Sequence, residues 1–106
     1  MLTKLSAIET VKMFAKDCIS NGIPLDEVIL FGSYSNNTQK LYSDMDVALV
    51  SSIFTGFGPE DIEKIAPIMF RMKAYHDIEP HTYSKNHFQK GDPFIDEIKK
   101  RGIKIL

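Results

Sequence analysis

Two acidic residues, Asp44 and Asp46, stand at the start of an apolar run, and the pair Gly32-Ser33 ends the apolar run before it. Alternate residues of a β-strand point to the same side, so both carboxylates would project from one face. Two carboxylates about 4 Å apart repel by about 1 kcal/mol in water and about 4 kcal/mol at an effective dielectric constant of 20. The pair therefore favours a cation between its oxygens, and oxygen ligands select a hard ion such as Mg²⁺ or Mn²⁺.

The residues before this pair are suited to binding phosphate. Gly32 lets the backbone turn sharply and approach a ligand closely, and Ser33 offers a hydroxyl and an amide. Tyr34 is suited either to stacking on a base or to packing the turn against the core, and Lys40 lies in the polar connection that follows. Together, turn and carboxylates indicate nucleotidyl transfer, in which metal ions orient a nucleoside triphosphate and the turn holds its outer phosphates.

Hydrophobic patterning predicts the elements that would position these residues. Apolar residues at helical intervals predict a first helix over about 5–20, with Ser6 and Glu9 at the spacing of a capping box. Short apolar runs bounded by turn signals predict strands over 26–31 and 44–50. Asp44, Asp46 and Ala48 would then share one face of the second strand.

The second half of the sequence predicts a helix, a strand and a further helix. The helix extends to about Ala74, with Pro67 kinking or dividing it. The strand covers 77–83, and Pro80 favours an edge position. Asp92 is a suitable cap for the last helix, which Gly102 ends, and 103–106 could add a short terminal strand.

The strand predicted over 77–83 offers a third carboxylate. Glu79 is the best candidate because its strand follows the intervening helix, and Asp77 is its rival on the same face. His81 is two residues further on and could touch a metal or a phosphate, although an exposed or hydrogen-bonded histidine is the commoner case.

Composition predicts one soluble domain over residues 1–106, an α/β unit with a small mixed sheet. The hydrophobic share is 43% and the net charge is −1, which gives no general attraction to nucleic acid or membrane. The single cysteine, Cys18, lies in an apolar helical stripe and is expected to be a buried, inert thiol. Without a signal region or a membrane-length apolar window, a cytoplasmic location is expected.

Other classes that use an Asp-x-Asp motif fit less well. Haloacid-dehalogenase phosphatases place the apolar strand before the motif, whereas here polar residues 40–43 precede Asp44 and the strand follows. Glycosyltransferases with this motif meet a similar objection. A dinucleotide-binding fold is disfavoured because Gly32 lacks the Gly-x-Gly-x-x-Gly context.

The order Gly32-Ser33, ten residues, Asp44-Met45-Asp46 resembles the signature of the minimal nucleotidyltransferase family of the DNA polymerase beta superfamily. Residues 78–81 resemble the third-carboxylate strand of these small domains, and residues 102–105 resemble their C-terminal end. The resemblance implies an α/β (α+β) nucleotidyltransferase fold, with a small mixed sheet flanked by helices.

The same resemblance implies a function. Asp44, Asp46 and Glu79 would bind two Mg²⁺ or Mn²⁺ ions, and Gly32, Ser33, Tyr34 and Lys40 are the candidate nucleotide contacts. The leading hypothesis is an enzyme that transfers a nucleoside monophosphate, AMP from ATP, to a hydroxyl of a protein or small molecule. Some members of the family pair with an all-helical HEPN protein in a toxin–antitoxin module.

One departure from the family bears on activity. Members commonly carry arginine and glycine where this chain has Asn36 and Asn37, which predicts weak triphosphate affinity or an altered donor preference. The competing hypothesis is therefore a binding module that keeps the fold and docks a partner such as a HEPN toxin. A third hypothesis is a small metal-binding domain without nucleotide. Since 106 residues leave no room for an acceptor domain, we expect a homo-oligomer or a separate subunit to hold the acceptor.

Overall fold

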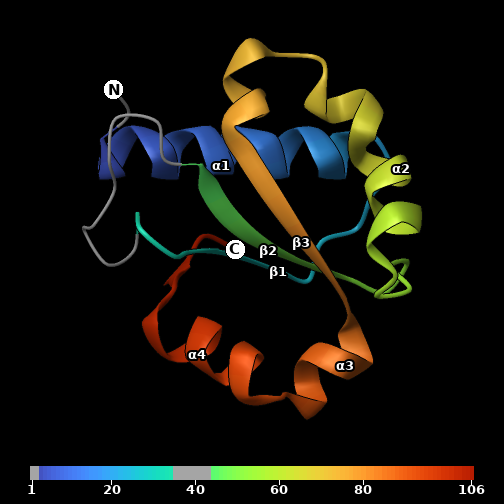
Figure 1. Cartoon of the computed structure of the whole chain (residues 1–106). Coiled ribbons are helices and arrows are strands. Elements are labelled where there is room, and N and C mark those ends of the chain that lie inside the picture. The colour runs from blue at the N-terminus through green and yellow to red at the C-terminus, as the bar shows by residue number, and fades with distance from the viewer. Residues whose placement is uncertain (1–2, 35–43) are drawn as a thin grey trace.

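The computed structural model describes residues 3–34 and 44–106 and has helices on both faces of a mixed four-stranded sheet (Figure 1). The elements in chain order are α1 (Lys4–Ser20), β1 (Glu27–Phe31), β2 (Met45–Ser51), α2 (Gly58–Met69), the 3₁₀ helix η1 (Lys73–Asp77), β3 (Ile78–Ser84), α3 (Lys85–Lys90), α4 (Pro93–Arg101) and β4 (Ile103–Lys104). The predicted α+β class with a small mixed sheet is confirmed.

The strand order β3-β2-β1-β4 fixes which residues are neighbours across the sheet. β1 runs antiparallel to β2 with Phe31 opposite Asp46, and β2 runs parallel to β3 with Asp46 opposite Glu79. β3 lies at an edge, where Pro80 does not remove a hydrogen bond from an inner strand. The sheet thus places two acidic residues side by side on neighbouring strands.

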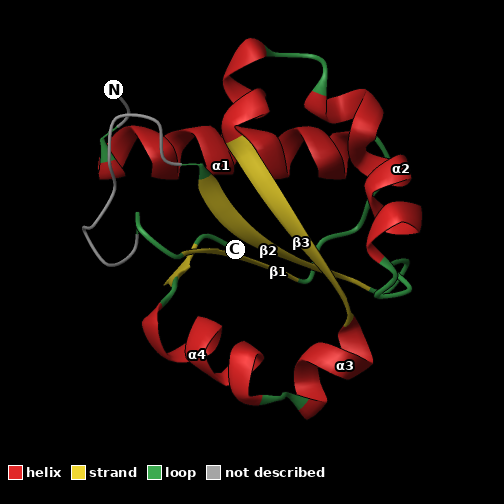
Figure 2. Ribbon diagram, viewed as in Figure 1, coloured by secondary structure: helices red, strands yellow, loops and turns green. Residues whose placement is uncertain are grey.

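Each face of the sheet packs against its own pair of helices (Figure 2). Met45, Val47 and Leu49 point to the face covered by α1 and α2, where they join the larger apolar core. Ala48 and Val50 point to the opposite face and contact the smaller core beneath α3 and α4. Asp46 shares this second face by the alternation of the strand. A one-residue slip would exchange the two sets, so burial on both faces fixes the register.

The first predicted helix is confirmed, but its cap is not the predicted one. Thr3 is the N-cap, its side chain accepts from the Ser6 amide, and the Ser6 hydroxyl accepts from the Thr3 amide. The capping box predicted for Ser6 and Glu9 is therefore wrong. Thr3 and Ser6 form the box three residues earlier, and Ser6 is the third residue of the helix.

The second predicted helix is shorter than expected. α2 runs through Pro67 without dividing there and ends at Met69, and residues 73–77 form η1 instead of continuing the helix. Helix α3 was not predicted. Its six residues lack room for an apolar repeat, although Ser84 caps it by accepting from the His87 amide. The cap at Asp92, the end of α4 at Gly102 and a two-residue terminal strand are confirmed.

Asp61 is a fully buried carboxylate that ties α2 to the loop before it and to β3. Its oxygens accept hydrogen bonds from the amides of Thr55 and Gly56 and from the hydroxyls of Thr55 and Thr82. Burial alone would raise the pKa of Asp61, but these hydrogen bonds outweigh burial and hold the pKa below its usual range. Asp61 therefore fixes where α2 starts relative to β3.

Cys18 lies in the core between α1 and the sheet, as expected. Burial, with a smaller contribution from the charge of Asp17, raises the pKa of the Cys18 thiol to about 12. The thiolate is the reactive form of cysteine, so the native protein holds an unreactive thiol.

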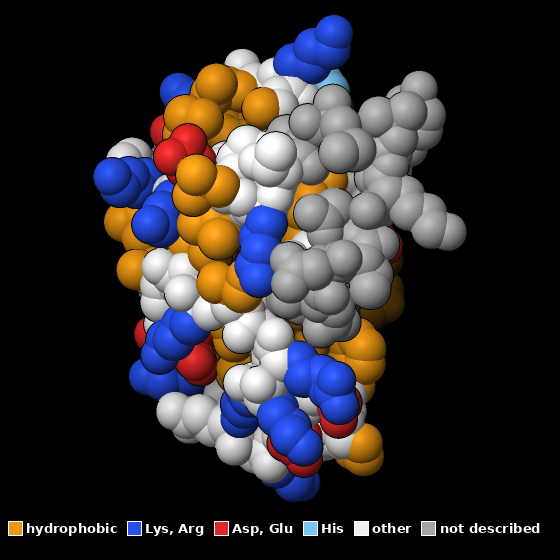
Figure 3. Space-filling view, turned by 90° about the vertical axis from the view of Figure 1, so that its left-hand side faces the viewer, with side chains coloured by type: hydrophobic (Ala, Val, Ile, Leu, Met, Phe, Trp, Pro, Cys, Tyr) orange, Lys and Arg blue, Asp and Glu red, His pale blue; other side chains and the backbone are white. Residues whose placement is uncertain are grey.

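Charged side chains are dispersed over the face seen in Figure 3. In its coloured part, Lys and Arg side chains alternate with acidic and hydrophobic ones and do not gather into one basic patch. This distribution agrees with a net charge of −1. Within the described residues, no helix is both long and apolar enough to span a membrane.

We predict that Asp61→Ala lowers the free energy of unfolding by about 2–4 kcal/mol at pH 7, because it removes the buried acceptor of four hydrogen bonds that hold the loop and β3 against α2. Folding lowers the pKa of Asp61. Its contribution to the free energy of unfolding is therefore complete above about pH 4 and is lost as the pH falls through the pKa that Asp61 has in the folded state. Urea unfolding at several pH values measures both effects.

Exposed Glu63 on the same helix supplies the control, and Glu63→Ala should change stability by about 0.5 kcal/mol or less. An unfolding free energy difference between wild type and Asp61→Ala that stays constant down to pH 3 would contradict the assignment.

Candidate active site

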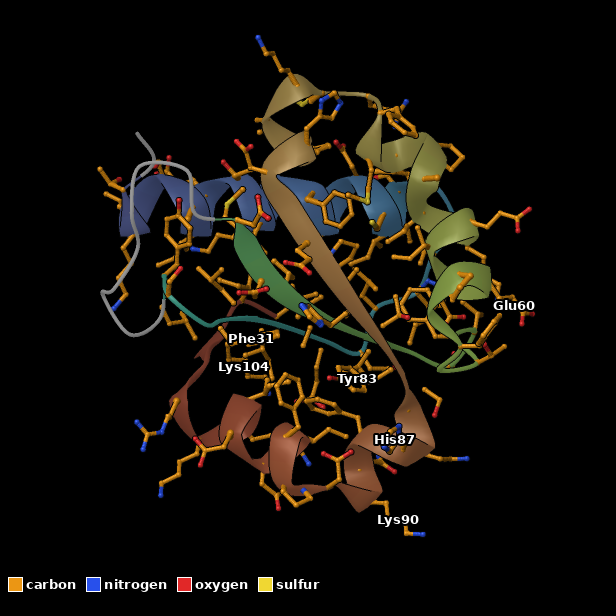
Figure 4. The ribbon with its side chains drawn as sticks, viewed as in Figure 1. Phe31, Glu60, Tyr83, His87, Lys90 and Lys104 are labelled. Carbon is orange, nitrogen blue, oxygen red and sulfur yellow. The ribbon has the colours of Figure 1, made fainter. Side chains whose placement is uncertain are left out.

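The candidate site lies where β1 ends and where β2 and β3 begin. Phe31 is the last residue of β1, and Asp46 and Glu79 are each the second residue of their strands. In Figure 4, Phe31 and Tyr83 mark the layer between the sheet and helices α3 and α4. The site therefore forms at one end of the strands, on the face of the smaller core.

Asp46, Glu79 and His81 form a cluster whose candidate ligand atoms all lie within 4.8 Å of one another. Asp46 and Glu79 meet through the parallel register of β2 and β3. His81 follows Glu79 by two residues and so points to the same side, where its Nε2 atom lies 3.2 Å from Oδ1 of Asp46. Asp46 and His81 are partly buried and Glu79 is exposed, so the cluster opens to solvent on the side of Glu79.

Gly32 packs directly against Asp46. Its backbone has φ +75°, and a Cβ atom added to it would clash with Oδ2 of Asp46. Only glycine satisfies both the positive φ and this close approach. The turn after β1 therefore leaves room for the carboxylate of Asp46, a requirement that the sequence motif does not reveal.

Aromatic rings support His81 from one side. The rings of His81 and Phe31 meet edge-on at 5.0 Å between centroids, and Phe31 in turn contacts Phe94 of α4 at 5.9 Å. Opposite His81 on β2 stands Ala48, which is fully buried. The small side chain of Ala48 leaves space for the imidazole to lean toward Asp46.

Asp44 and Asp77, the other candidate carboxylates, lie outside this cluster. Asp44 is exposed and precedes β2, which begins at Met45 and not at Asp44 as predicted. Asp77 is the last residue of η1 and not part of the third strand. Of the two rivals for the third carboxylate, the structure places Glu79 beside Asp46.

Tyr34 is a core residue. Its side chain is 1% exposed, and it joins the core with α1. Burial, then the charges of Asp77 and Asp44, raise the pKa of its phenol, so both carboxylates act on this ring. A ring with no exposed face cannot stack on a base. Of the two roles expected for Tyr34, base stacking is therefore wrong, and packing of the turn against the core is what the structure shows.

Of the remaining candidate nucleotide contacts, the structure describes Gly32 and Ser33 but not Lys40. Ser33 is partly buried and lies in the turn directly after β1. Lys40, Asn36 and Asn37 lie outside the described residues. The contribution that the loop makes to the site is therefore a prediction from the sequence alone.

His81 is the one member of the cluster that sequence reasoning did not include among the site residues. The available signal was its position two residues after Glu79, which places both side chains on one face of a strand. What the spacing did not show was that Ala48 and Phe31 orient the ring toward Asp46.

The cluster fits a divalent cation by its donor chemistry. Two carboxylates and an imidazole nitrogen are ligands for transition-metal dications, and the carboxylates also suit Mg²⁺. Without a cation, two negative charges about 4–5 Å apart repel by about 3–4 kcal/mol at an effective dielectric constant of 20. Asp46, Glu79 and His81 are thus the residues that would hold such an ion.

Residues 11–105 match the family described as nucleotidyltransferase domain. Because the match covers most of the chain, this protein belongs to that family, which confirms the membership expected from the Gly-Ser and Asp-x-Asp motif.

A relative and two solved structures agree with this assignment. A Methanocaldococcus jannaschii protein provisionally named a protein adenylyltransferase is 33% identical in an alignment of 105 positions that covers 95% of this chain and all of the relative. The crystal structure of a provisionally named nucleotidyltransferase from Sulfolobus solfataricus superposes with a TM-score of 0.66 at 17% identity, covering 95% of this chain and 80% of the other.

The second structure is that of a toxin–antitoxin with AMP-PNP. One chain of it superposes with a TM-score of 0.54 at 20% identity, covering 90% of this chain and 72% of that chain. At these identities the two solved structures show that the nucleotidyltransferase fold is shared.

We predict that Gly32→Ala weakens Mn²⁺ binding by about tenfold or more, because the added Cβ must displace the carboxylate of Asp46. The strain of a non-glycine residue at positive φ should also cost about 1–2 kcal/mol of folding stability. Calorimetric titration with Mn²⁺ and thermal unfolding measure the two effects.

Gly22→Ala is a matched control. Gly22 has φ +86°, and a Cβ atom added there would meet nothing within 4 Å, so this variant carries the same backbone strain without disturbing Asp46. Equal loss of Mn²⁺ affinity in both variants would show that the effect of Gly32→Ala comes from general destabilisation.

Proposed function

We propose that this protein is a metal-dependent nucleotidyltransferase that transfers AMP from ATP to a hydroxyl group of a protein or small molecule. The observation that carries the proposal is the packing of Gly32 against the carboxylate of Asp46, with Glu79 in register beside it. This packing supports the proposal because the turn that would bind phosphate and the carboxylates that would bind metal lie at the same end of the sheet.

The chemistry can be assigned to residues of this chain. The amide and hydroxyl of Ser33 and the backbone at Gly32 would bind the outer phosphates of ATP. The hydroxyl oxygen of the acceptor attacks the α-phosphorus, and its proton passes to a carboxylate oxygen of Glu79. The bond between the α-phosphorus and the bridging oxygen breaks, and pyrophosphate leaves on the side of the turn.

A bound divalent cation would neutralise the charge that develops on the phosphate oxygens. Asp46 and Glu79 are the carboxylates placed to hold it, and Mg²⁺ and Mn²⁺ are both compatible with them. Asp44, exposed just before β2, is the proposed ligand for a second ion.

The proposed identity of the acceptor rests on a relative and on a structural neighbour. A relative at 33% identity carries the provisional name of protein adenylyltransferase, which favours a protein hydroxyl as acceptor. A structural neighbour is described as a toxin–antitoxin with AMP-PNP, which favours a partner protein as the source of the acceptor, and the HEPN-type helical protein expected from the sequence is the proposed partner.

The second candidate function is a binding module that keeps this fold but transfers nothing. The observation that favours it is the pair Asn36 and Asn37, at positions where family members commonly carry arginine and glycine. Such a protein would neutralise its partner by docking alone.

ATP labelled at its α-phosphate, incubated with the protein, Mg²⁺ or Mn²⁺ and a lysate of the source cells, tests the two functions. We expect label on an acceptor, with pyrophosphate released, and a decrease of about a hundredfold or more in Asp46→Asn. ATP labelled at the γ-phosphate should leave the acceptor unlabelled.

Exposed Glu63 on α2 again supplies a matched charge-removal control, and Glu63→Gln should retain transfer. Label transfer that survives in Asp46→Asn would rule out this site, while partner neutralisation without any transfer would favour the binding module.

A further inference from the structure

We propose that His81 is a metal ligand and that, as a result, the site prefers Mn²⁺ to Mg²⁺. The proposal rests on the nucleotidyltransferase site described above, because it takes Asp46 and Glu79 as the carboxylate ligands. It adds a nitrogen donor to a site that the sequence motif presents as carboxylates alone.

The spacing between His81 and Asp46 fits two neighbouring ligands of one ion. Octahedral ions with ligand distances of about 2.1 Å place adjacent ligands about 3.0 Å apart. Nε2 of His81 lies 3.2 Å from Oδ1 of Asp46. Glu79 belongs to the same cluster and is exposed, so its carboxylate can rotate toward an ion held by the other two.

The packing around His81 holds the ring in this direction. Phe31 contacts the imidazole edge-on, and buried Ala48 opposite it presents only a methyl group. Partial burial limits the other rotamers, so the ligand atom needs little reorganisation to meet a cation.

A second histidine in the chain provides a comparison. Nε2 of His87 lies 3.1 Å from Oδ2 of Asp92, nearly the same spacing. Within residues 3–34 and 44–106, however, the only grouping of three potential ligands is that of Asp46, Glu79 and His81. The His87 pair is therefore an ordinary polar contact between α3 and the cap of α4, and the third ligand distinguishes His81 from it.

The donor set determines which ion is preferred. Mg²⁺ strongly favours oxygen ligands, whereas transition-metal dications accept imidazole nitrogen. Mn²⁺ accepts carboxylates as Mg²⁺ does and, as a transition-metal dication, also accepts an imidazole nitrogen, so the three side chains together suit Mn²⁺ better than Mg²⁺. Loss of the imidazole should therefore weaken the binding of Mn²⁺ much more than the binding of Mg²⁺.

Electron spin echo envelope modulation of the Mn²⁺-loaded full-length protein tests the ligand directly, because a coordinated imidazole gives a characteristic nitrogen modulation. We expect this modulation in the wild type and in His87→Gln, and its loss in His81→Gln. In competition titrations, the ratio of Mn²⁺ to Mg²⁺ affinity should fall by about tenfold in His81→Gln and stay unchanged in His87→Gln.

The outcomes separate this proposal from the proposed function. Mn²⁺ binding without nitrogen modulation in the wild type, or modulation that persists in His81→Gln, overturns the role of His81 and leaves the carboxylate site intact. No binding of Mn²⁺ even with a non-hydrolysable ATP analogue overturns the metal site itself. If His81→Gln does not fold, the test uses protein labelled with ¹⁵N-histidine. The nitrogen modulation must then change from the ¹⁴N to the ¹⁵N pattern in the wild type and in His87→Gln, and modulation that keeps the ¹⁴N pattern would overturn the proposal.

Discussion

The parallel pairing of β2 with β3 is the constraint on which the rest of the site depends. It sets Asp46 opposite Glu79, and the alternation of β3 then brings His81 to the same face. A site built on strands is held more firmly than one built on loops, and β2, which carries Asp46, is an inner strand of the sheet. The register of the strands thus brings the members of the cluster within a few ångströms of one another.

The two faces of the sheet serve different purposes. The larger core under α1 and α2 takes the apolar residues that alternate with Asp46 and so keeps the strand in register. In the smaller core under α3 and α4, Phe31 and Ala48 shape the surroundings of His81. Asp61, buried between α2 and β3, supports the same register from the other end of the strand.

The cluster of Asp46, Glu79 and His81 is open to solvent on one side. Glu79 is the exposed member of the cluster, so in the proposed reaction an incoming hydroxyl would approach from its side. Helix α4 forms one wall of the site, because its Phe94 contacts Phe31, which in turn contacts the ring of His81. The opposite wall is the natural place for a partner in the proposed reaction.

The sequence by itself determined the fold class, the order of the strands along the chain and the presence of a turn followed by carboxylates, since periodicity and turn residues are local signals. It did not determine which carboxylates meet. Asp44 and Asp77 satisfy the spacing as well as Asp46 and Glu79 do, but Asp44 precedes its strand and Asp77 ends a 3₁₀ helix. Register, the rotation of His81 and the burial of Tyr34 depend on contacts between residues far apart in the sequence. Only tertiary packing decides such contacts, because one residue of slip in a strand moves every side chain to the other face.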